Sequence, residues 1–240
     1  MIKKKLNISA IIYCRSNSKR LKNKPFIQIK KLSLLERVIM TTKKIKGIQK
    51  IIVATTVNKN DDGIIKIAKK KNIFTFRGSE NNVLDRTIKC INKFDIDYFV
   101  RICADRVFFD HKEISKYLLK YKKDIKKHDI LTNLYNNGKK IDPGLTIEIV
   151  SCKSLKDIYH NRKEKIISKE HITKSFYNNY RKFRILYLKS PDYFYKGFKY
   201  TIDNLEDLKR SRYVCKKINI KNNIREIIKE TSTWYEKKLF

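Results

Sequence analysis

Short runs of consecutive apolar residues alternate, along the first 103 positions, with segments in which apolar residues recur every three or four positions. The continuous runs lie at about 7–14, 51–56, 73–76 and 98–103. Runs of this kind predict strands buried on both faces of a sheet. The segments between them, around 33–45, 61–68 and 83–91, predict amphipathic helices, the first capped by Ser33 and the second opened by Asp61 and Asp62.

This order of elements predicts a doubly wound α/β fold with a mostly parallel sheet covered by helices on both faces. Ligands of such sheets bind beyond the carboxyl ends of the strands. Over about 125–195 the rhythm changes to short strand-like pieces at 129–132, 145–150 and 183–188, around helical stretches near 152–162 and 168–180. We expect this part to be an α+β insertion that serves acceptor binding and dimerisation.

After the insertion, a strand-like piece at 199–203 leads into two further helices. Asn204 can cap the first helix. The apolar positions expected to face inward are Leu205, Leu208, Val214 and Ile218 in the first helix, and Ile224, Ile227, Ile228 and Trp234 in the second. The sequence contains no internal repeat and no Pro/Gly/Ser-rich linker, so one unit over residues 1–240 is the simplest organisation.

The formal net charge of +34 has two interpretations. A basic protein can bind a polyanion such as nucleic acid. Lysines are, however, spread over every segment, as A/T-rich coding produces, whereas a nucleic-acid binder shows a basic stripe or a recognised module. We therefore expect no specific nucleic-acid partner, and a basic nucleic-acid-binding protein remains the alternative from another class.

Cysteine and histidine spacing argues against disulfides and zinc. The five cysteines are far apart, which is typical of reduced thiols in a cytoplasmic protein, and the four histidines form no close ligand pair. The N-terminal apolar stretch is interrupted by Arg15 before a secretory signal could form, and no apolar run approaches the ~20 residues that span a bilayer. The expected location is the cytoplasm, without a membrane partner.

A basic loop follows the first strand. Its sequence, CRSNSKRLKNKP over 14–25, holds the cations Arg15, Lys19, Arg20, Lys22 and Lys24. At the carboxyl end of a strand such charges can bind a triphosphate, with Arg20 making forked contacts and Lys24 acting as a point charge. The alternative is a solvated loop in a lysine-rich protein.

Several ordered motifs favour the first interpretation. The basic loop matches A-R-x-G-S-x-R-L-P-G-K, and V-A-T-T, F-R-G-S-E and D-V-L-D-R correspond to 53–56, 76–80 and 82–86. P-x-G-L-D-V-E, E-H-V-T and T-V-D-T-P-E-D-L are similar to the segments at 143–148, 170–173 and 201–208. Over about 8–215 the chain resembles the SpsF-type cytidylyltransferases of spore coat polysaccharide biosynthesis, which are related to CMP-sialic acid and CMP-Kdo synthetases and share a nucleotide-diphospho-sugar transferase fold.

The resemblance implies a role for each matching residue. CTP would be bound by Arg15, Ser18, Arg20, Lys24, Arg77, Asp85 and Arg86, and the sugar acceptor by Glu148 and His171. Asp105 and Asp203 would bind Mg²⁺, and these two would act in catalysis together with Arg20 and Lys24. A divalent cation suits two neighbouring carboxylates, because like charges otherwise raise each other's pKa.

Structural alternatives remain for several of these residues. Asp203 directly precedes a helix cap, and Asp85 and Arg86 could form an ion pair on a helix surface. His171 could equally be a packed or surface histidine. Arg106, beside Asp105, could compete with Mg²⁺ or contact phosphate.

The reaction implied by the resemblance is transfer of CMP from CTP to an acidic, nonulosonate-like sugar, with release of pyrophosphate, by a homodimer. Two glycines of the family loop are replaced by Asn17 and Asn23. Asn tolerates positive φ better than most other non-glycine residues. These departures leave open a catalytically degenerate relative. Nucleotidyl transfer to another acceptor, such as a sugar phosphate or phosphonate, is a separate alternative within the enzyme class.

Overall fold

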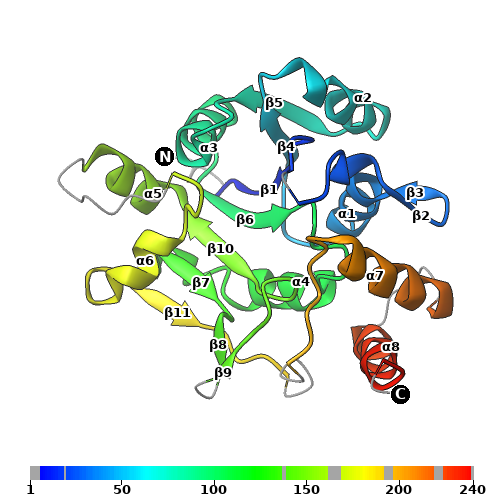
Figure 1. Ribbon diagram of the computed structural model, residues 1–240. Helices are drawn as coiled ribbons and strands as arrows, with labels where there is room; N and C mark the ends of the chain where they lie inside the picture. Colours follow the sequence, from blue (N-terminus) through cyan, green and yellow to red (C-terminus); the bar gives the residue numbers. More distant parts are fainter. Residues whose placement is uncertain are drawn as a thin grey trace.

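A seven-stranded sheet runs through the centre of the computed structural model (Figure 1), which describes residues 6–18, 20–136, 139–161, 169–191, 197–218 and 224–238. Its strands are β1 (Ile8–Tyr13), β4 (Ile51–Thr56), β5 (Phe74–Gly78), β6 (Tyr98–Cys103), β7 (Ile130–Thr132), β10 (Glu148–Ser151) and β11 (Ile185–Tyr187). Their order across the sheet is β11-β7-β10-β6-β1-β4-β5. Lys19, one of the basic-loop cations, lies outside the described residues.

Strand directions confirm the predicted mostly parallel sheet. Strands β1, β4, β5 and β6 pair in parallel, as do β7 and β11, whereas β10 runs antiparallel to both of its neighbours. The carboxyl ends of β1 and β6 are therefore adjacent, with Tyr13 opposite Cys103. This places the segments that follow them, the basic loop and Asp105, at one edge of the sheet.

Helices cover both faces of the sheet. One face carries α1 (Leu34–Thr42), α2 (Asp62–Lys70), α4 (His111–Lys120), α7 (Leu205–Lys217) and α8 (Ile224–Glu236), and the other carries α3 (Val83–Lys93), α5 (Cys152–His160) and α6 (Lys174–Asn178). Alternate β1 residues supply the two cores, because successive side chains of a strand point to opposite faces. Ala10 and Ile12 join the first core, and Ile11 and Tyr13 the second.

The remaining elements are short strand pairs and 3₁₀ turns. They are the strand pairs β2 (Gln28–Ile29) with β3 (Leu32–Ser33) and β8 (Tyr135–Asn136) with β9 (Lys139–Lys140), and the 3₁₀ turns Lys24–Phe26, Lys59–Asp61, Ile125–Lys127 and Tyr180–Lys182. Among the helices of the described ranges, none has the length and apolar character needed to cross a bilayer.

Capping residues explain where two predicted helices begin. Ser33 and Glu36 form a reciprocal capping box at α1, and Asn204 forms one with Asp207 at α7. The prediction that Leu205 faces inward was wrong, because this first residue of α7 is 65% exposed. Helix α4, capped by Asp110, was not predicted.

The insertion contributes to the main sheet. Strands β7, β10 and β11 all belong to the seven-stranded sheet, so these short strands find their partners there. Each pairs over three residues, which is why the sequence signal of any one strand is weak. Strand β11 forms the outer edge of the sheet.

Candidate active site

The basic loop is anchored at the carboxyl end of β1 by the buried carboxylate of Asp61. Its Oδ1 accepts hydrogen bonds from the backbone N and the hydroxyl of Ser16, at 2.8 and 2.6 Å. Its Oδ2 accepts from the hydroxyls of Thr55 and Thr56 and from Thr56 N. Burial raises the pKa of Asp61, but these hydrogen bonds lower it more, so the carboxylate stays ionised. Asp61 thus ties the loop to the end of β4.

The loop then turns back towards the sheet through Asn23. The carbonyl of Ser16 accepts from Ser18 N and Asn23 N, at 2.9 and 3.1 Å. Asn23 has φ 53° and ψ 26°, in the left-handed region, where Asn is among the better-tolerated non-glycine residues. The Asn that replaces a family glycine here therefore adopts the conformation that a glycine would favour, and the next residue, Lys24, opens the 3₁₀ turn that it forms with Pro25 and Phe26.

Lys24 lies between two carboxylates that are far apart in sequence. Its Nζ is 3.0 Å from Asp105 Oδ2 and 3.7 Å from Asp203 Oδ1. It also donates to the carbonyl of Ile202, at 2.9 Å. A backbone hydrogen bond from Ile202 N to Asp105 O, at 3.1 Å, joins the two carboxylate-bearing segments. The structure therefore brings together Lys24, Asp105 and Asp203, which the sequence placed in one site.

Two further cations contact Asp203. Arg20 Nη2 is 3.0 Å from Oδ1, although the Arg20 side chain is 71% exposed, and Lys199 Nζ is 3.2 Å from Oδ2. Burial raises the pKa of Asp203, but the hydrogen bond from Lys199 and the neighbouring positive charges lower it more, so its pKa lies below the usual range. Lys199 was not predicted as a site residue. Its position two residues before the T-I-D motif could have indicated that it lies near Asp203.

The oxygen atoms around Lys24 Nζ fit a divalent cation. Asp105, Asp203 and the Ile202 carbonyl offer the hard oxygen donors that Mg²⁺ takes, and Mg²⁺ sites commonly use one or two carboxylates together with substrate phosphates. Within the described ranges, no group of three or more His, Cys, Asp or Glu side chains surrounds such a position. A cation at this position would therefore have two protein carboxylates, those of Asp105 and Asp203, near it.

Arg15 and Ser18 lie on the basic loop between β1 and Lys24. Arg15 Nη2 makes an exposed contact of 3.4 Å with Glu170, next to the exposed His171. The carbonyl of Lys169 accepts from Val83 N and Leu84 N at the start of α3. The segment around His171 thus lies between the basic loop and α3.

The remaining predicted nucleotide residues make contacts within the protein. Arg77 donates to the carbonyls of Thr56 and Asn58 and pairs with Asp62 at 2.5 Å. Asp85 accepts from the Tyr159 hydroxyl at 3.0 Å and pairs with Lys89, on the next turn of α3. The alternative of an Asp85–Arg86 surface ion pair was wrong, because Arg86 is buried.

Arg86 is a buried cation at the head of α3. Its Nη1 donates to Ser79 O at 2.7 Å, and its Nε has no hydrogen-bond partner among the described residues. Burial lowers the pKa of Arg86, but a guanidinium remains charged at neutral pH.

Glu148 belongs to a buried network on β6, β10 and α6. Arg101 Nη1 is 2.6 Å from its Oε2, and the Tyr177 hydroxyl donates to Oε1 at 2.9 Å. Burial raises the pKa of Glu148, but the charges of Arg101 and Arg106 lower it more. Arg106 is itself buried and donates to Thr146 O. Within the described part of the chain, which includes Arg106 and Asp105, no ion pair joins these two residues. The expectation that Arg106 competes for Asp105 or contacts phosphate has no support in these contacts.

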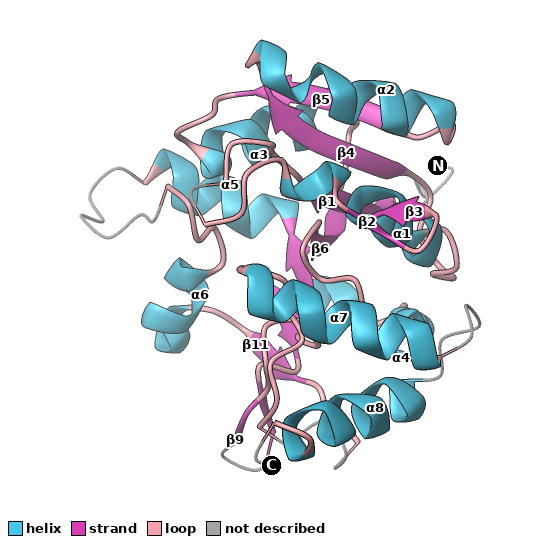
Figure 2. Cartoon of the chain, turned by 45° about the vertical axis from the view of Figure 1, so that its right-hand side comes forward, coloured by secondary structure: helices cyan, strands magenta, loops and turns pink. Residues whose placement is uncertain are grey.

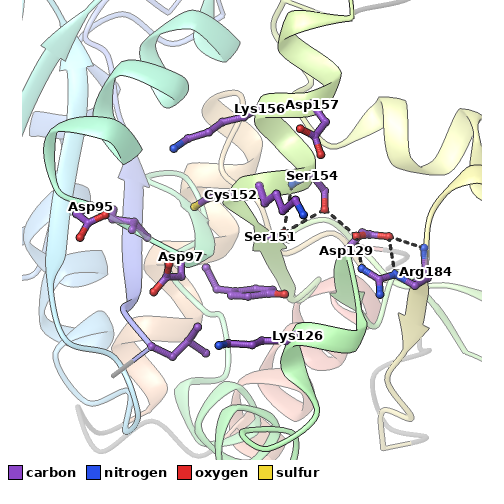
Figure 3. Close-up of a pocket in the computed structure, with 14 residues that line it drawn as sticks. Asp95, Asp97, Lys126, Asp129, Ser151, Cys152, Ser154, Lys156, Asp157 and Arg184 are labelled. Carbon is purple, nitrogen blue, oxygen red and sulfur yellow. Dashed lines mark hydrogen bonds and ion pairs between the residues drawn. The ribbon is translucent and has the colours of Figure 1, made fainter. Parts of the chain in front are cut away.

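A cavity of about 690 Å³ lies at the opposite, amino-terminal edge of the sheet (Figure 3). Asp97, Asp129, Cys152 and Arg184 are among its lining residues. Asp97, Asp129 and Arg184 directly precede β6, β7 and β11, and Cys152 is the first residue of α5. The cavity therefore lies at the other end of β6 from Lys24, which is near the carboxyl ends of β1 and β6.

Solved structures share this fold. A cytidylyltransferase from Leptospira borgpetersenii superimposes with a TM-score of 0.86 at 22% identity, covering 97% of this chain and 96% of that one. A CMP:2-keto-3-deoxy-manno-octonic acid synthetase complexed with CTP gives a TM-score of 0.62 at 12% identity, covering 86% and 97%. These likenesses show the fold, an α/β architecture of the nucleotidyltransferase class.

The sequence comparisons identify the family. The cytidylyltransferase family model matches residues 9–239, so the chain belongs to the cytidylyltransferase family. It is 35% identical to the uncharacterized protein MJ1063 of Methanocaldococcus jannaschii, over 93% of this chain and 89% of that protein. It is also 26% identical to the spore coat polysaccharide biosynthesis protein SpsF of Bacillus subtilis, over 84% and 83%. The resemblance found in the sequence is confirmed.

Proposed function

We propose that the protein transfers CMP from CTP to a hydroxyl of an acidic, nonulosonate-like sugar and releases pyrophosphate. The observation that carries the proposal is the position of Lys24, between Asp105 and Asp203 and at the end of the basic loop. Membership of the cytidylyltransferase family supports the nucleotide. The acidic acceptor is supported by the likeness to the CMP:2-keto-3-deoxy-manno-octonic acid synthetase, and a role in surface polysaccharide formation by the likeness to SpsF.

In the proposed reaction the acceptor oxygen forms a bond to the α-phosphorus of CTP while the bond to the bridging oxygen of the β-phosphate breaks. The hydroxyl loses its proton to water, and pyrophosphate carries away the bonding electron pair. Arg20 and Lys24 stabilise the negative charge that develops on the leaving group, and the anchored loop aligns the phosphates. Burial and the Asp61 hydrogen bonds keep that loop in place before substrate binds.

Asp105 and Asp203 would hold Mg²⁺ in this proposal. When bound, the ion supplies charge neutralisation on the phosphates. The same two carboxylates attract Lys24 in this structure, so the proposal requires Lys24 to exchange carboxylate contacts for phosphate contacts.

We also propose a homodimer that forms through the insertion. The support is that β11, among the strands of the described ranges, pairs with β7 alone and lies at the edge of the sheet, and that Tyr135 and Tyr187 lie beside each other with 43% and 48% exposure. A free edge and exposed aromatic rings suit a contact with a second copy of the chain. Light scattering at micromolar concentration tests this, and a monomeric mass would contradict it.

The decisive experiment measures pyrophosphate release from CTP and Mg²⁺ across a panel of acidic sugars, neutral sugars and sugar phosphates. The proposal expects release with an acidic sugar and with CTP in preference to ATP, GTP or UTP. Release with a sugar phosphate alone would move the assignment to another acceptor. Equal thermal stabilisation by all four nucleotides would contradict the choice of cytidine.

A further inference from the structure

Helix α7, which begins two residues after Asp203, carries a buried ion pair. Arg210 Nη1 is 2.9 Å from Asp207 Oδ1, and the two side chains are 2% and 5% exposed. Removing two charges from water is costly, and well-packed apolar residues often replace such a pair without loss of stability. Stability alone therefore does not explain why this helix buries an arginine and an aspartate.

The pair is bonded to the backbone on both sides of Ile202, the residue whose carbonyl accepts from Lys24. Arg210 Nη2 donates to Thr201 O at 2.8 Å. Asp207 Oδ2 accepts from the backbone N atoms of Asp203 and Asn204, at 2.8 and 3.2 Å. These bonds fix the backbone from which both the Asp203 carboxylate and the Ile202 carbonyl project.

Lys199 connects the buried pair to the site. Its Nζ lies 2.5 Å from Asp207 Oδ2 and 3.2 Å from Asp203 Oδ2, so a single ammonium is shared by the buried carboxylate and the site carboxylate. The Thr201 hydroxyl adds a hydrogen bond to the same Asp203 oxygen, at 3.1 Å. Asp203 Oδ2 is thus held from behind, while Oδ1 faces Lys24 and Arg20.

The C-terminal helix supports the pair from the other side. Helices α7 and α8 pack side by side (Figure 2), and Arg210 Nη1 donates to the Tyr235 hydroxyl at 3.3 Å. The Tyr235 ring stacks on Phe198, with centroids 4.9 Å apart and an interplanar angle of 10°. Phe198 directly precedes Lys199, so α8 contacts both the buried pair and the start of the segment that carries Asp203.

We infer that Asp207 and Arg210 are positioning residues for the cation and phosphate site. They hold Asp203 and the Ile202 carbonyl beside Asp105, while neither side chain itself contacts Lys24, Arg20 or Asp105. This inference rests on the proposed function, since it assigns the held atoms to a divalent cation. Partners of this kind behind metal ligands change metal affinity by about 10- to 100-fold when they are removed.

The test compares Mn²⁺ binding to wild-type protein, Arg210→Met, Arg210→Lys and Asp207→Asn, each saturated with CTP, by electron paramagnetic resonance. We expect Arg210→Met and Asp207→Asn to weaken Mn²⁺ binding about 10-fold or more, and Arg210→Lys to restore part of it. In turnover with CTP, the Mg²⁺ concentration for half-maximal activity rises by a similar factor, while the KM for CTP changes less than about threefold, because the basic loop is intact.

The matched control is Asp129→Asn, which removes another buried carboxylate from its arginine partner at the far edge of the sheet. It should leave Mn²⁺ binding unchanged. Tyr235→Phe removes only the hydroxyl that accepts from Arg210 and should weaken Mn²⁺ binding slightly, so it keeps the inference testable if Arg210→Met does not fold, as judged by circular dichroism.

Two failures are distinguishable. Wild-type protein that binds Mn²⁺ and CTP, with Arg210→Met and Asp207→Asn indistinguishable from Asp129→Asn, would overturn the inference and leave the proposed function standing. Wild-type protein that binds neither Mn²⁺ nor CTP would overturn the proposed function, and the inference with it.

Discussion

Aspartates at the two edges of the central sheet are paired with cations in different ways. At the amino-terminal edge, Asp129 accepts hydrogen bonds from Ser154 Oγ and from three nitrogen atoms of Arg184, at 2.7 to 3.2 Å. At the carboxyl edge, one Lys24 ammonium is shared by Asp105 and Asp203, and Arg20 reaches the same group from solvent.

The difference teaches which edge is prepared for a ligand. The Asp129 carboxylate is paired with Arg184 within the protein, beside a cavity that Lys126 and Lys153 also line. Lys24 and Arg20 instead converge on oxygen atoms that a metal ion can also take, and both side chains are long enough to turn towards phosphate. We therefore base the proposed function on the charges paired around Lys24 and not on the size of the cavity.

The largest expected effect comes from Asp105→Asn. Removing this charge takes away one of the two carboxylates at Lys24, so we expect CMP transfer to fall about 100-fold or more, and its dependence on Mg²⁺ to be lost. Pyrophosphate release measured against Mg²⁺ concentration checks this. If Asp129→Asn instead produced the same loss, the distinction between the two edges would be wrong.

Lys24→Ala should have opposite effects on two measurements. Loss of a charge-assisted phosphate contact costs about 1.5–3 kcal/mol, which lowers CMP transfer by roughly 10- to 150-fold. Because Lys24 occupies the same oxygen atoms, the nucleotide-free variant should bind Mn²⁺ more tightly than wild type. Arg20→Ala should also reduce transfer strongly.

Lys22→Ala is the control for these two substitutions, because Lys22 is exposed and its loss should cost well under about 1 kcal/mol. Lys19→Ala is expected to behave in the same way. Equal, small losses in all four variants would mean that the loop supplies only diffuse positive charge.

Asp61→Asn tests the anchor of the basic loop. The substitution places an amide group against the hydroxyls and the backbone N–H that Asp61 binds, so we expect a loss of about 1–3 kcal/mol in the free energy of unfolding at neutral pH and weaker CTP binding. Denaturant unfolding and titration with CTP measure the two effects.

The pH dependence of stability follows from the same carboxylate. The folded-state pKa of Asp61 is lowered, so its stabilising contribution is complete above the ordinary Asp pKa of about 3.9 and is lost as the pH falls through the lower, folded-state value. When the pH is lowered from about 5 to about 2, which brackets the ordinary Asp pKa, the free energy of unfolding should fall more for wild type than for Asp61→Asn. Equal losses would contradict an ionised Asp61 in the folded protein.

Among the aspartate substitutions, Asp129→Asn should have the smallest effect on CMP transfer. Its partner Arg184 is 63% exposed, so solvent screens the ion pair, and we expect a loss of about 1–2 kcal/mol in the free energy of unfolding. CTP turnover should be unchanged. A fall in turnover without a fall in stability would assign the amino-terminal edge a role in the reaction.

Local signals in the sequence predicted the elements that local physics determines. Ser33 and Asn204 were predicted as helix caps because their side chains bond to backbone N–H groups within the same turn. Leu205 was misassigned because apolar spacing alone does not show that the first residue of a capped helix lies outside the core. Strand β11 could not be matched to β7, because that pairing joins segments more than 50 residues apart.

The candidate site was predicted in part, and through motifs. The family pattern placed Lys24, Asp105 and Asp203 together, which their contacts show. No local pattern indicated that Asp61 would bond to Ser16 instead of capping α2, since that bond depends on how β1 and β4 pair. Arg86 and Arg210 look like surface cations in sequence, and only the packing of α3 and α7 shows that both are buried.

The separation of the site residues along the chain affects when the site can form during synthesis. Arg20 and Asp203 are 183 positions apart, and Lys24 and Ile202 are 178 apart. At about 5–20 residues per second, a ribosome adds the Asp203 segment roughly 10 to 40 s after the basic loop. A nascent chain that ends before Thr201 can pair Lys24 with Asp105 but holds no second carboxylate. A chain released early by a premature stop codon would thus keep its basic loop and lack the group that completes the cluster.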